Sequence, residues 1–287
     1  MTNEQKGLHK KSQSSGVYVR LDVAKNSNTH PKTLMKLSND KEIIVREEVA
    51  KNPNTPAEIL DKLSNDKELS VRRLVAQNKN LSLQALENLS NDKEKMVRSG
   101  VIYNPKVPIQ ILEKLSEDKE TMVRYDLASN PKTPSKLLDK LSDDKDWTVR
   151  SSVAYNSSAS NKLLEKLSND KESGVRESVV SNDNVTPEIL KRLSDDENRG
   201  VRYRIAQNAK TPKDILEKLS GDKIYDIRRN VAANPNTSSQ TLENLSNEND
   251  EWIRSIVVNH PNVSFKTLKK LSQDKNQKIA QEAAKNI

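Results

Sequence analysis

The sequence predicts an all-α solenoid, in which short helices stack along one direction instead of surrounding a single core. Of the 287 residues, 33% are hydrophobic, 3% are aromatic and 31% are charged, a mixture too polar for a domain with one thick core. A Val-Arg or Ile-Arg pair returns every 26 residues without insertion or deletion. Each period holds two short amphipathic segments, which can bury their apolar faces only against neighbouring periods.

The repeat is marked by an arginine that follows Val or Ile. This arginine stands at ten positions: Arg20, Arg46, Arg72, Arg98, Arg124, Arg150, Arg176, Arg202, Arg228 and Arg254. The register persists to Ile279, where Ala280 takes the place of the arginine. The chain therefore contains ten complete repeats and a final half-repeat. A repeat length of 26 residues is typical of stacked repeat proteins.

Several columns of the repeat hardly vary. We number the places of each repeat so that the Val or Ile before the marker arginine is place 1 and the arginine is place 2. Places 16 and 19 are Leu and place 20 is Ser in all ten complete repeats, beginning with Leu34, Leu37 and Ser38. Place 22 is Asp except at Glu248, and place 8 is Asn except at His260. We expect these columns to build the stack, because every repeat must present the same surface to its neighbours.

The first helix of a repeat is predicted from stretches such as NTPAEILDKLSND, which begins at Asn54. Thr55 is a suitable N-cap, Pro56 suits the first helical position, and Glu58 would complete a capping box. The apolar stripe that this helix would bury comprises Ile59, Leu60 and Leu63.

The second helix is predicted to begin near Asp66 and to run through KELSVRRLVAQN. Its inward residues are expected to include Val71 and Val75. An Asn-Pro pair such as Asn52-Pro53 closes several repeats, since proline resists continuation of a helix.

The polar N-terminal segment differs from the rest of the chain. Residues 1–16, MTNEQKGLHKKSQSSG, show no periodic apolar pattern, so we predict a disordered leader there and a single repeat domain over residues 17–287. The sequence has no apolar run of signal-peptide length and none that approaches the roughly 18 residues of a membrane helix. We therefore expect a cytoplasmic protein without membrane contact.

The repeat resembles a known family. The pattern Leu-x-x-Leu-Ser-x-Asp, followed by Val-Arg, resembles HEAT-type repeats, and the form VAxNPxTPxxxLxxLSxDxxxxVR is similar to the variant leucine-rich repeats of bacterial HEAT-like proteins. The resemblance covers residues 17–287. It implies a right-handed α-solenoid of ten 26-residue two-helix repeats plus a terminal half-repeat, with the second helices lining a concave groove. Some members carry a cysteine-rich cluster-binding module, but this chain has no cysteine.

The marker arginines are interpreted as a structural ladder and not as a phosphate-binding stripe. Seven of them follow an acid four residues earlier, as Glu42 precedes Arg46, which is a favourable spacing on a helix. The Asp at place 22 lies six residues before each arginine, a spacing that resembles the Asp–Arg ladder of HEAT repeats. The residues assigned to the ladder are Arg46, Arg72, Arg98, Arg124, Arg150, Arg176 and Arg202 with Asp40, Asp66, Asp92, Asp118, Asp144 and Asp170.

Function is expected at the places that vary. With about 100° per residue, places 25, 26, 3 and 7 of the second helix face away from the buried places 1 and 5, and they hold eight of the nine aromatic residues. The candidate groove residues are Tyr103, Tyr125, Trp147, Tyr155, Tyr203, Tyr225 and Trp252, with the basic Arg73, Lys95, Arg199 and Arg229. The alternative is that these aromatics pack between neighbouring second helices and set the curvature.

Several functions remain open for such a groove. Mixed charges among aromatic residues favour a non-catalytic scaffold that holds a protein or peptide. Aromatic and basic residues, with a net charge of +8, also suit a nucleic acid, particularly a single strand. Bacterial HEAT-like DNA glycosylases resemble this chain, and an enzyme of that kind would need a carboxylate such as Asp126 or Asp226, although neither lies in a recognisable motif.

The residues that could bind a metal, bind a phosphate or act as a catalytic triad are scattered along the sequence. His9, His30 and His260 share no spacing that suits a metal. The six glycines do not cluster into a phosphate loop, and the serine column has no paired histidine. We therefore expect no metal, no cofactor and no enzymatic activity.

Overall fold

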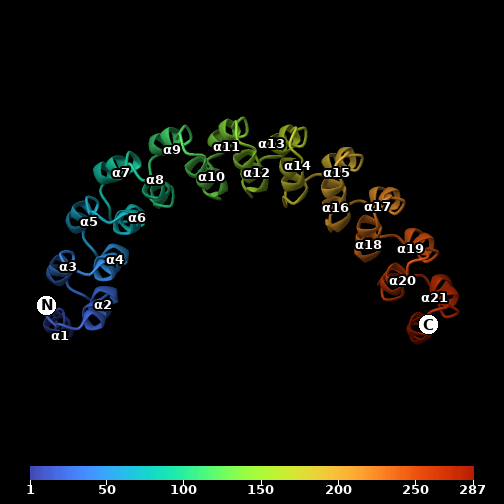
Figure 1. Cartoon of the computed structure of the whole chain (residues 1–287), viewed down its shortest axis with the longest axis horizontal. Helices are drawn as coiled ribbons and strands as arrows, with labels where there is room; N and C mark the ends of the chain where they lie inside the picture. The colour runs from blue at the N-terminus through green and yellow to red at the C-terminus, as the bar shows by residue number, and fades with distance from the viewer. The chain divides into compact units, whose positions relative to one another are not determined.

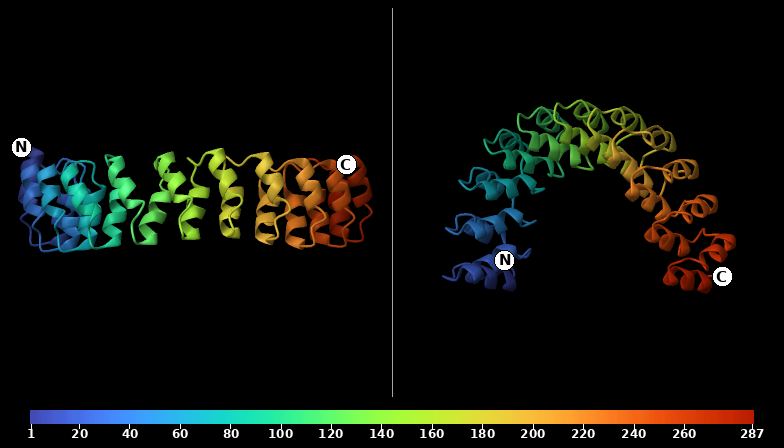
Figure 2. Two further views of the ribbon diagram at one scale, coloured as in Figure 1. Left: turned by 90° about the horizontal axis from the view of Figure 1, so that it is seen from above. Right: turned by 45° about the vertical axis from the view of Figure 1, so that its right-hand side comes forward.

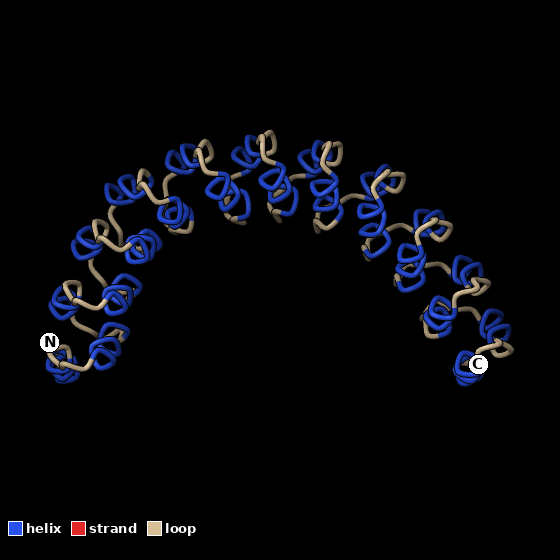
Figure 3. Tube along the Cα trace, in the orientation of Figure 1, coloured by secondary structure: helices blue, strands red, loops and turns tan.

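The computed structural model describes residues 1–287, and all of its regular elements are α-helices, which confirms the all-α fold class (Figure 3). The first helices of the repeats are the odd-numbered ones: α1 (Asn3–Lys11), α3 (Pro31–Leu37), α5 (Ala57–Leu63), α7 (Leu83–Ser90), α9 (Ile109–Leu115), α11 (Ser135–Leu141), α13 (Asn161–Leu167), α15 (Pro187–Leu193), α17 (Lys213–Leu219), α19 (Ser239–Leu245) and α21 (Phe265–Leu271). The second helices are the even-numbered ones: α2 (Val17–Lys25), α4 (Ile43–Lys51), α6 (Leu69–Gln77), α8 (Lys95–Ile102), α10 (Thr121–Ser129), α12 (Trp147–Tyr155), α14 (Ser173–Val180), α16 (Arg199–Gln207), α18 (Tyr225–Ala233), α20 (Glu251–Val258) and α22 (Gln277–Lys285).

The helices gather into two compact units, Met1–Leu141 and Ser142–Ile287. In each unit the odd-numbered helices form one layer and the even-numbered helices form the other, which lies on the inner side of the unit's curve (Figure 1). Successive even-numbered helices lie side by side within a unit, as α4 does with α6 and α12 with α14 (Figure 2). The repeat register runs through both units, and a single domain over residues 17–287 stays a prediction.

The core of each repeat is built from the constant apolar columns. Ile59, Leu60 and Leu63 from α5 are at most 2% exposed. Val71 and Val75 from α6 are fully buried. Burying one such side chain stabilises the fold by about 1.5–3 kcal/mol, so the stack is held by the columns that the sequence indicated.

The start of the first helix differs from the predicted capping box. Helix α5 begins at Ala57, with Pro56 as its N-cap and no side-chain hydrogen bond at the cap. Thr55 is instead fully buried, and its hydroxyl donates to the Val49 carbonyl oxygen at 2.7 Å. This threonine therefore closes the preceding second helix, and the same bond is made by Thr29, Thr133, Thr211 and Thr237.

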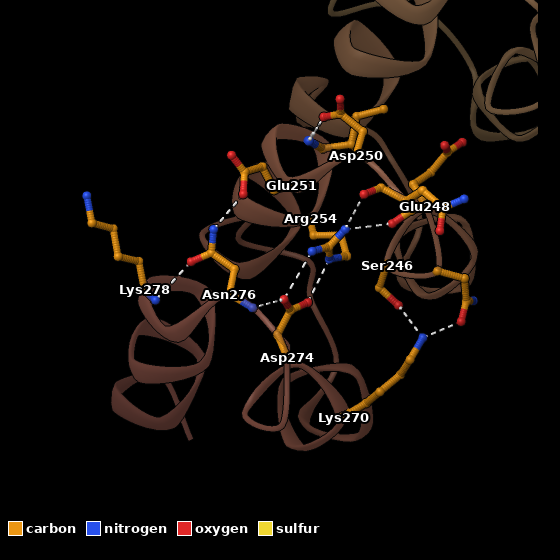
Figure 4. A network of polar contacts seen from close by, with 12 residues as sticks. Ser246, Glu248, Asp250, Glu251, Arg254, Lys270, Asp274, Asn276 and Lys278 are labelled. Atoms are coloured by element: carbon orange, nitrogen blue, oxygen red, sulfur yellow. Dashed lines mark hydrogen bonds and ion pairs between the residues drawn. The ribbon is translucent and has the colours of Figure 1, made fainter.

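A first helix and the second helix that follows it form one helix pair, which is the structural form of the repeat. The marker arginine joins its own helix pair to the next one. Arg46 Nε donates to Asp66 Oδ2 at 2.7 Å, and Arg46 Nη2 donates to Asp66 Oδ1 at 3.1 Å. Arg46 Nη1 donates to the Asp40 carbonyl oxygen of its own helix pair at 2.8 Å. The pair of Arg254 and Asp274 has the same two-pronged geometry (Figure 4). The partner of each such arginine is thus the place-22 carboxylate twenty residues later, which belongs to the next helix pair, and not the acid four residues earlier.

The ladder aspartates are held as carboxylates. Burial alone would raise the pKa of the Asp66 carboxyl, but hydrogen bonds from Arg46 and from the Glu68 backbone N–H, with the charge of Arg46, lower this pKa below its ordinary value. Because the carboxylate fixes the Glu68 N–H, α6 begins at Leu69 and not near Asp66 as predicted. The same balance lowers the pKa of Asp40, Asp92, Asp118, Asp170 and Asp222.

The asparagine at place 8 forms a second ladder. Asn52 Nδ2 donates to the carbonyl oxygens of Ala24 and Asn26 in the preceding repeat, at 2.7 and 3.0 Å. Its Oδ1 accepts from the Asn54 backbone N–H at 2.9 Å. One amide therefore satisfies the end of one helix and the turn of the next repeat, as Asn78, Asn104, Asn182 and Asn234 also do.

Helix α1 contradicts the prediction of a disordered leader for the segment that it covers. Leu8 and Ser12 stand one repeat length before Leu34 and Ser38, so α1 occupies the position of a first helix. Lys11 stands where all complete repeats have Leu at place 19, and it is exposed. Such a polar outer surface is typical of a capping helix in a repeat stack.

Candidate binding surface

The variable places form one face of each unit. We call this the second-helix face, and it comprises the side chains at places 25, 26, 3 and 7 of the even-numbered helices. Most of the predicted aromatic residues are strongly exposed on it: Tyr103 (47%), Tyr125 (44%), Trp147 (47%), Tyr155 (67%) and Trp252 (67%). The face also carries half-buried Tyr203, Tyr225 and Arg73 and exposed Lys95, Arg199 and Arg229.

Aromatic side chains at place 25 reach the next second helix. A Cβ placed on Gly174 of α14 would lie only 2.7 Å from Cζ3 of the Trp147 ring, so the indole packs directly against α14. The Tyr225 hydroxyl donates to Asp250 Oδ1 at 3.2 Å, and that carboxylate also caps α20. These two residues therefore bridge neighbouring helices, as the packing alternative expects, while part of each ring stays accessible.

Place 3 of one second helix faces place 4 of the next. The buried Ser99 hydroxyl donates to the Asp126 carboxylate, and the hydroxyls of Ser151 and Ser178 lie 2.8 Å apart. Burial and then the charge of Asp126 raise the pKa of the Tyr103 hydroxyl above its ordinary value. The carboxylate suggested for a glycosylase is thus held by a serine and flanked by a tyrosine.

The unit Met1–Leu141 carries a row of exposed apolar side chains at places 25 and 26. The exposed fractions lie between 36% and 74%, and the row comprises Tyr18, Ile43, Ile44, Leu69, Met96 and Met122. In the other unit the same places include the small residues Ser173, Gly174 and Gly200. At the helix starts, the aliphatic and Met side chains of the second-helix face are therefore confined to one unit, whereas the other unit carries Trp147 and Trp252 there.

A hollow of about 500 Å³ opens between α20 and α22 on the second-helix face. It is lined by the indole of Trp252, the apolar side chains of Val258 and Ile279, and the carboxylates of Glu251 and Glu282. The sequence assigned Trp252 to the groove and places Glu251 in one of the same four columns, but it did not indicate Glu282. The columns of the two glutamates vary and they come from different repeats, so only the packing of α20 beside α22 brings them together.

Comparison with solved structures supports this architecture. A leucine-rich repeat variant, described as having a novel repetitive structural motif, superimposes with a TM-score of 0.55. The two sequences are 21% identical, and the match covers 87% of this chain and 88% of that one. The chain has the fold of a leucine-rich repeat variant.

Other comparisons add nothing to this fold. The X-ray structure of YIBA_ECOLI is 15% identical over 95% of this chain and 97% of that chain, but its TM-score is 0.30, too low to carry an argument. No family model and no curated protein matches the sequence.

On this leucine-rich repeat variant fold, the buried arginine–aspartate pairs join neighbouring helix pairs. The structure contains no cluster of three or more His, Cys, Asp or Glu side chains that could hold a metal ion. None of the helices is both long enough and apolar enough to cross a bilayer. The exposed aromatic residues remain the feature that the stack itself does not require.

Proposed function

We propose that this chain is a non-catalytic binding scaffold that holds a protein or peptide segment along the second-helix face. The observation that carries the proposal is the exposure of aromatic side chains on the second-helix face of each unit, namely Tyr103 and Tyr125 in one unit and Trp147, Tyr155 and Trp252 in the other. Exposed Tyr and Trp side chains among scattered charges are the residue types of binding hot spots. The ladders hold the helices that present them, so the face is preorganised for a partner.

The charges on the second-helix face and directly beside it favour a protein segment over a nucleic acid. Basic and acidic groups of adjacent helices lie close together, as Lys95 Nζ lies 3.9 Å from Glu120 Oε2 and Arg204 Nε lies 3.9 Å from Glu177 Oε2. A surface that tracks a phosphate backbone would present its cations without such neighbours. A nucleic-acid strand is the second candidate, because Arg199 and Arg229 are exposed among the aromatics.

The proposal is tested with the double variant Trp147→Ala, Tyr155→Ala and a displayed library of random peptides. We expect wild-type protein to enrich peptides whose affinity falls at least about tenfold in the double variant, since hot-spot truncations cost about 2 kcal/mol or more. Phe265→Ala is the matched control, because Phe265 is 63% exposed but lies on the odd-numbered helix α21. Equal binding by all three proteins would contradict the proposal.

The nucleic-acid candidate is tested with labelled single-stranded and double-stranded DNA and RNA. A nucleic-acid scaffold would bind with an affinity that falls steeply between about 50 and 200 mM salt. If peptides are not enriched while a strand binds in this way and depends on Trp147 and Tyr155, the partner is a nucleic acid.

A further inference from the structure

We propose that the hollow between α20 and α22 binds the guanidinium group of an arginine side chain from the partner segment. This proposal rests on the proposed function, because it assumes that a protein segment lies on the second-helix face, and it adds the chemistry of one anchor. The hollow measures about 500 Å³. Three features of its lining select this ligand: an exposed indole, oriented carboxylates and a local excess of negative charge.

The indole of Trp252 supplies the wall on which a planar cation can stack. Its side chain is 67% exposed, so no neighbouring residue covers most of the ring. The start of α20 is fixed because Asp250 Oδ1 accepts the backbone N–H groups of Trp252 at 2.9 Å and Ile253 at 3.2 Å. Tryptophan is the strongest aromatic partner for a cation, and guanidinium stacks on aromatic faces.

The carboxylate of Glu251 is oriented by a neutral partner. Asn276 Nδ2 donates to Glu251 Oε2 at 2.7 Å, while Asn276 Oδ1 accepts from the Lys278 backbone N–H at 3.0 Å and so caps α22 (Figure 4). The amide is therefore held at both ends. Because this contact is with an amide and not a cation, it positions Glu251 without neutralising its charge.

The second carboxylate comes from α22. Glu282 Oε2 lies 3.5 Å from Lys285 Nζ in an exposed pair, which is a weak interaction in water. The lining contains Glu251 and Glu282 against the single cation Lys278, whose ammonium makes no contact among the residues drawn in Figure 4. The lining itself thus carries one more acidic than basic side chain, with Lys285 beside it, on a chain with a net charge of +8. A guanidinium fits better than an ammonium, since its flat fork can pair with a carboxylate while it stacks.

Place 3 of this repeat is small, as it also is at Ser99 and Ser151. Ser255 occupies that place and lines the hollow. Other repeats fill the same place with larger side chains, which include Arg73, Tyr125, Tyr203 and Arg229. A tyrosine is therefore compatible with the fold at place 3, which makes Ser255→Tyr a suitable way to fill the hollow.

The test uses the full chain and two short peptides that differ only in a central arginine or citrulline. Citrulline keeps the shape of arginine but lacks its charge. The chain has two tryptophans, so the indole N–H resonances report where a peptide binds, with the Trp252→Phe variant assigning the signals. We expect the arginine peptide to shift the Trp252 resonance and to bind at least about tenfold more tightly than the citrulline peptide, because its hydrogen bonds are charge-assisted.

Variants of the lining residues distinguish specific binding in the hollow from nonspecific electrostatic attraction of the peptide to the protein. Glu251→Gln and Glu282→Gln should each weaken binding of the arginine peptide by about tenfold, and Ser255→Tyr should abolish it. Asp226→Asn is the matched control, since it removes one exposed acid from the same face on α18. Binding that does not distinguish arginine from citrulline, or a Trp252 resonance that does not respond, would overturn the proposal.

The outcome for this site is distinguishable from the outcome for the scaffold. If the arginine peptide fails while displayed peptides still bind through Trp147 and Tyr155, the arginine site is wrong and the scaffold stands. If no displayed peptide is enriched, the scaffold proposal falls, and with it the role of the hollow as an anchor.

Discussion

At the scale of single residues, Trp147 has a contact that can be tested through its neighbour Gly174. A Cβ on Gly174 would meet the indole at 2.7 Å. We expect Gly174→Ala to destabilise wild-type protein by about 1 kcal/mol through overpacking, measured by denaturant unfolding. In a Trp147→Ala background the same change should be neutral or stabilising by up to about 1 kcal/mol, because alanine favours a helix more than glycine.

Gly7→Ala is the control for the comparison of Gly174→Ala with and without Trp147. Gly7 lies in helix α1, and a Cβ there would have no neighbour within 4 Å, so only the helix preference of alanine acts. An identical effect of Gly174→Ala with and without Trp147 would show that the indole does not pack on α14. The sequence placed Trp147 on an exposed, variable column, but it could not reveal Gly174 as a partner, because glycine at that place leaves no pattern.

The ladder pair of Arg46 and Asp66 predicts a dependence of stability on pH. The pKa of Asp66 is lowered in the folded state, whereas an unfolded chain has an Asp pKa of about 3.9. The stabilisation is therefore fully present above the unfolded pKa and is lost as pH falls through the folded pKa. Asp66→Asn should reduce the free energy of unfolding by about 3 kcal/mol at neutral pH, since it leaves a buried arginine without its charge partner.

The pH series provides the check on that prediction. Between about pH 5 and pH 2, the free energy of unfolding of Asp66→Asn should fall less steeply than that of the wild type. Parallel curves would mean that Asp66 does not contribute through its charge. The sequence identified both ladder columns but not the partner, because its spacing indicated the acid four residues before and the place-22 Asp six residues before the arginine, whereas the carboxylate that pairs with Arg46 lies twenty residues after it.

At the scale of elements, the sequence predicted most helices but not all of their ends. The apolar period predicted α5 and α6. Their first residues depend on two hydrogen bonds that the period does not show, one from the Thr55 hydroxyl to the Val49 carbonyl oxygen and one from the Glu68 N–H to the Asp66 carboxylate. Helices α8, α14 and α20 end one residue before the other second helices of complete repeats. Their place 6 holds Ile102, Val180 and Val258, where the remaining complete repeats have alanine. A side chain larger than alanine at place 6 is thus found where the second helix ends one residue earlier.

Helix α1 is the element that the sequence missed, because Lys11 interrupts the leucine column and no marker arginine precedes it. Its packing is nevertheless specific. His9 Nδ1 lies 2.9 Å from Thr33 Oγ1, and Ser12 is 2% exposed. These contacts join α1 to the first helix that follows it in the stack.

Removal of residues 1–13 should therefore loosen the neighbouring helices. We expect amide hydrogen exchange to accelerate in α2 and α3, because Thr33 loses the partner that covers it and local opening becomes easier. Exchange in α20, which belongs to the other unit, serves as the internal control and should not change. Unaltered protection of α2 and α3 would contradict the capping role of α1.

At the scale of the whole molecule, stability should be a sum over repeats and the interfaces between neighbours. The sequence could predict this architecture because the same columns recur in both units. It could not predict the hollow lined by Glu251 and Glu282, since these residues come from two helices, α20 and α22, that lie side by side only in the fold. The structural columns are strict because they face identical neighbours, whereas the columns of the second-helix face vary and identify no partner by themselves.

Interchangeable repeats predict that one complete repeat can be excised. Deleting residues 201–226 joins Gly200 to Ile227 in register, so Arg228 can donate to the Asp196 carbonyl oxygen in place of Arg202, which makes that bond at 2.7 Å. We expect a cooperatively folded protein whose unfolding enthalpy and denaturant slope fall by roughly one-tenth, in proportion to length. Deleting only residues 201–213 is the control. It breaks the register of the ladders and should unfold the second unit, as followed by circular dichroism. If both deletions unfold the chain equally, register is not what holds the repeats together.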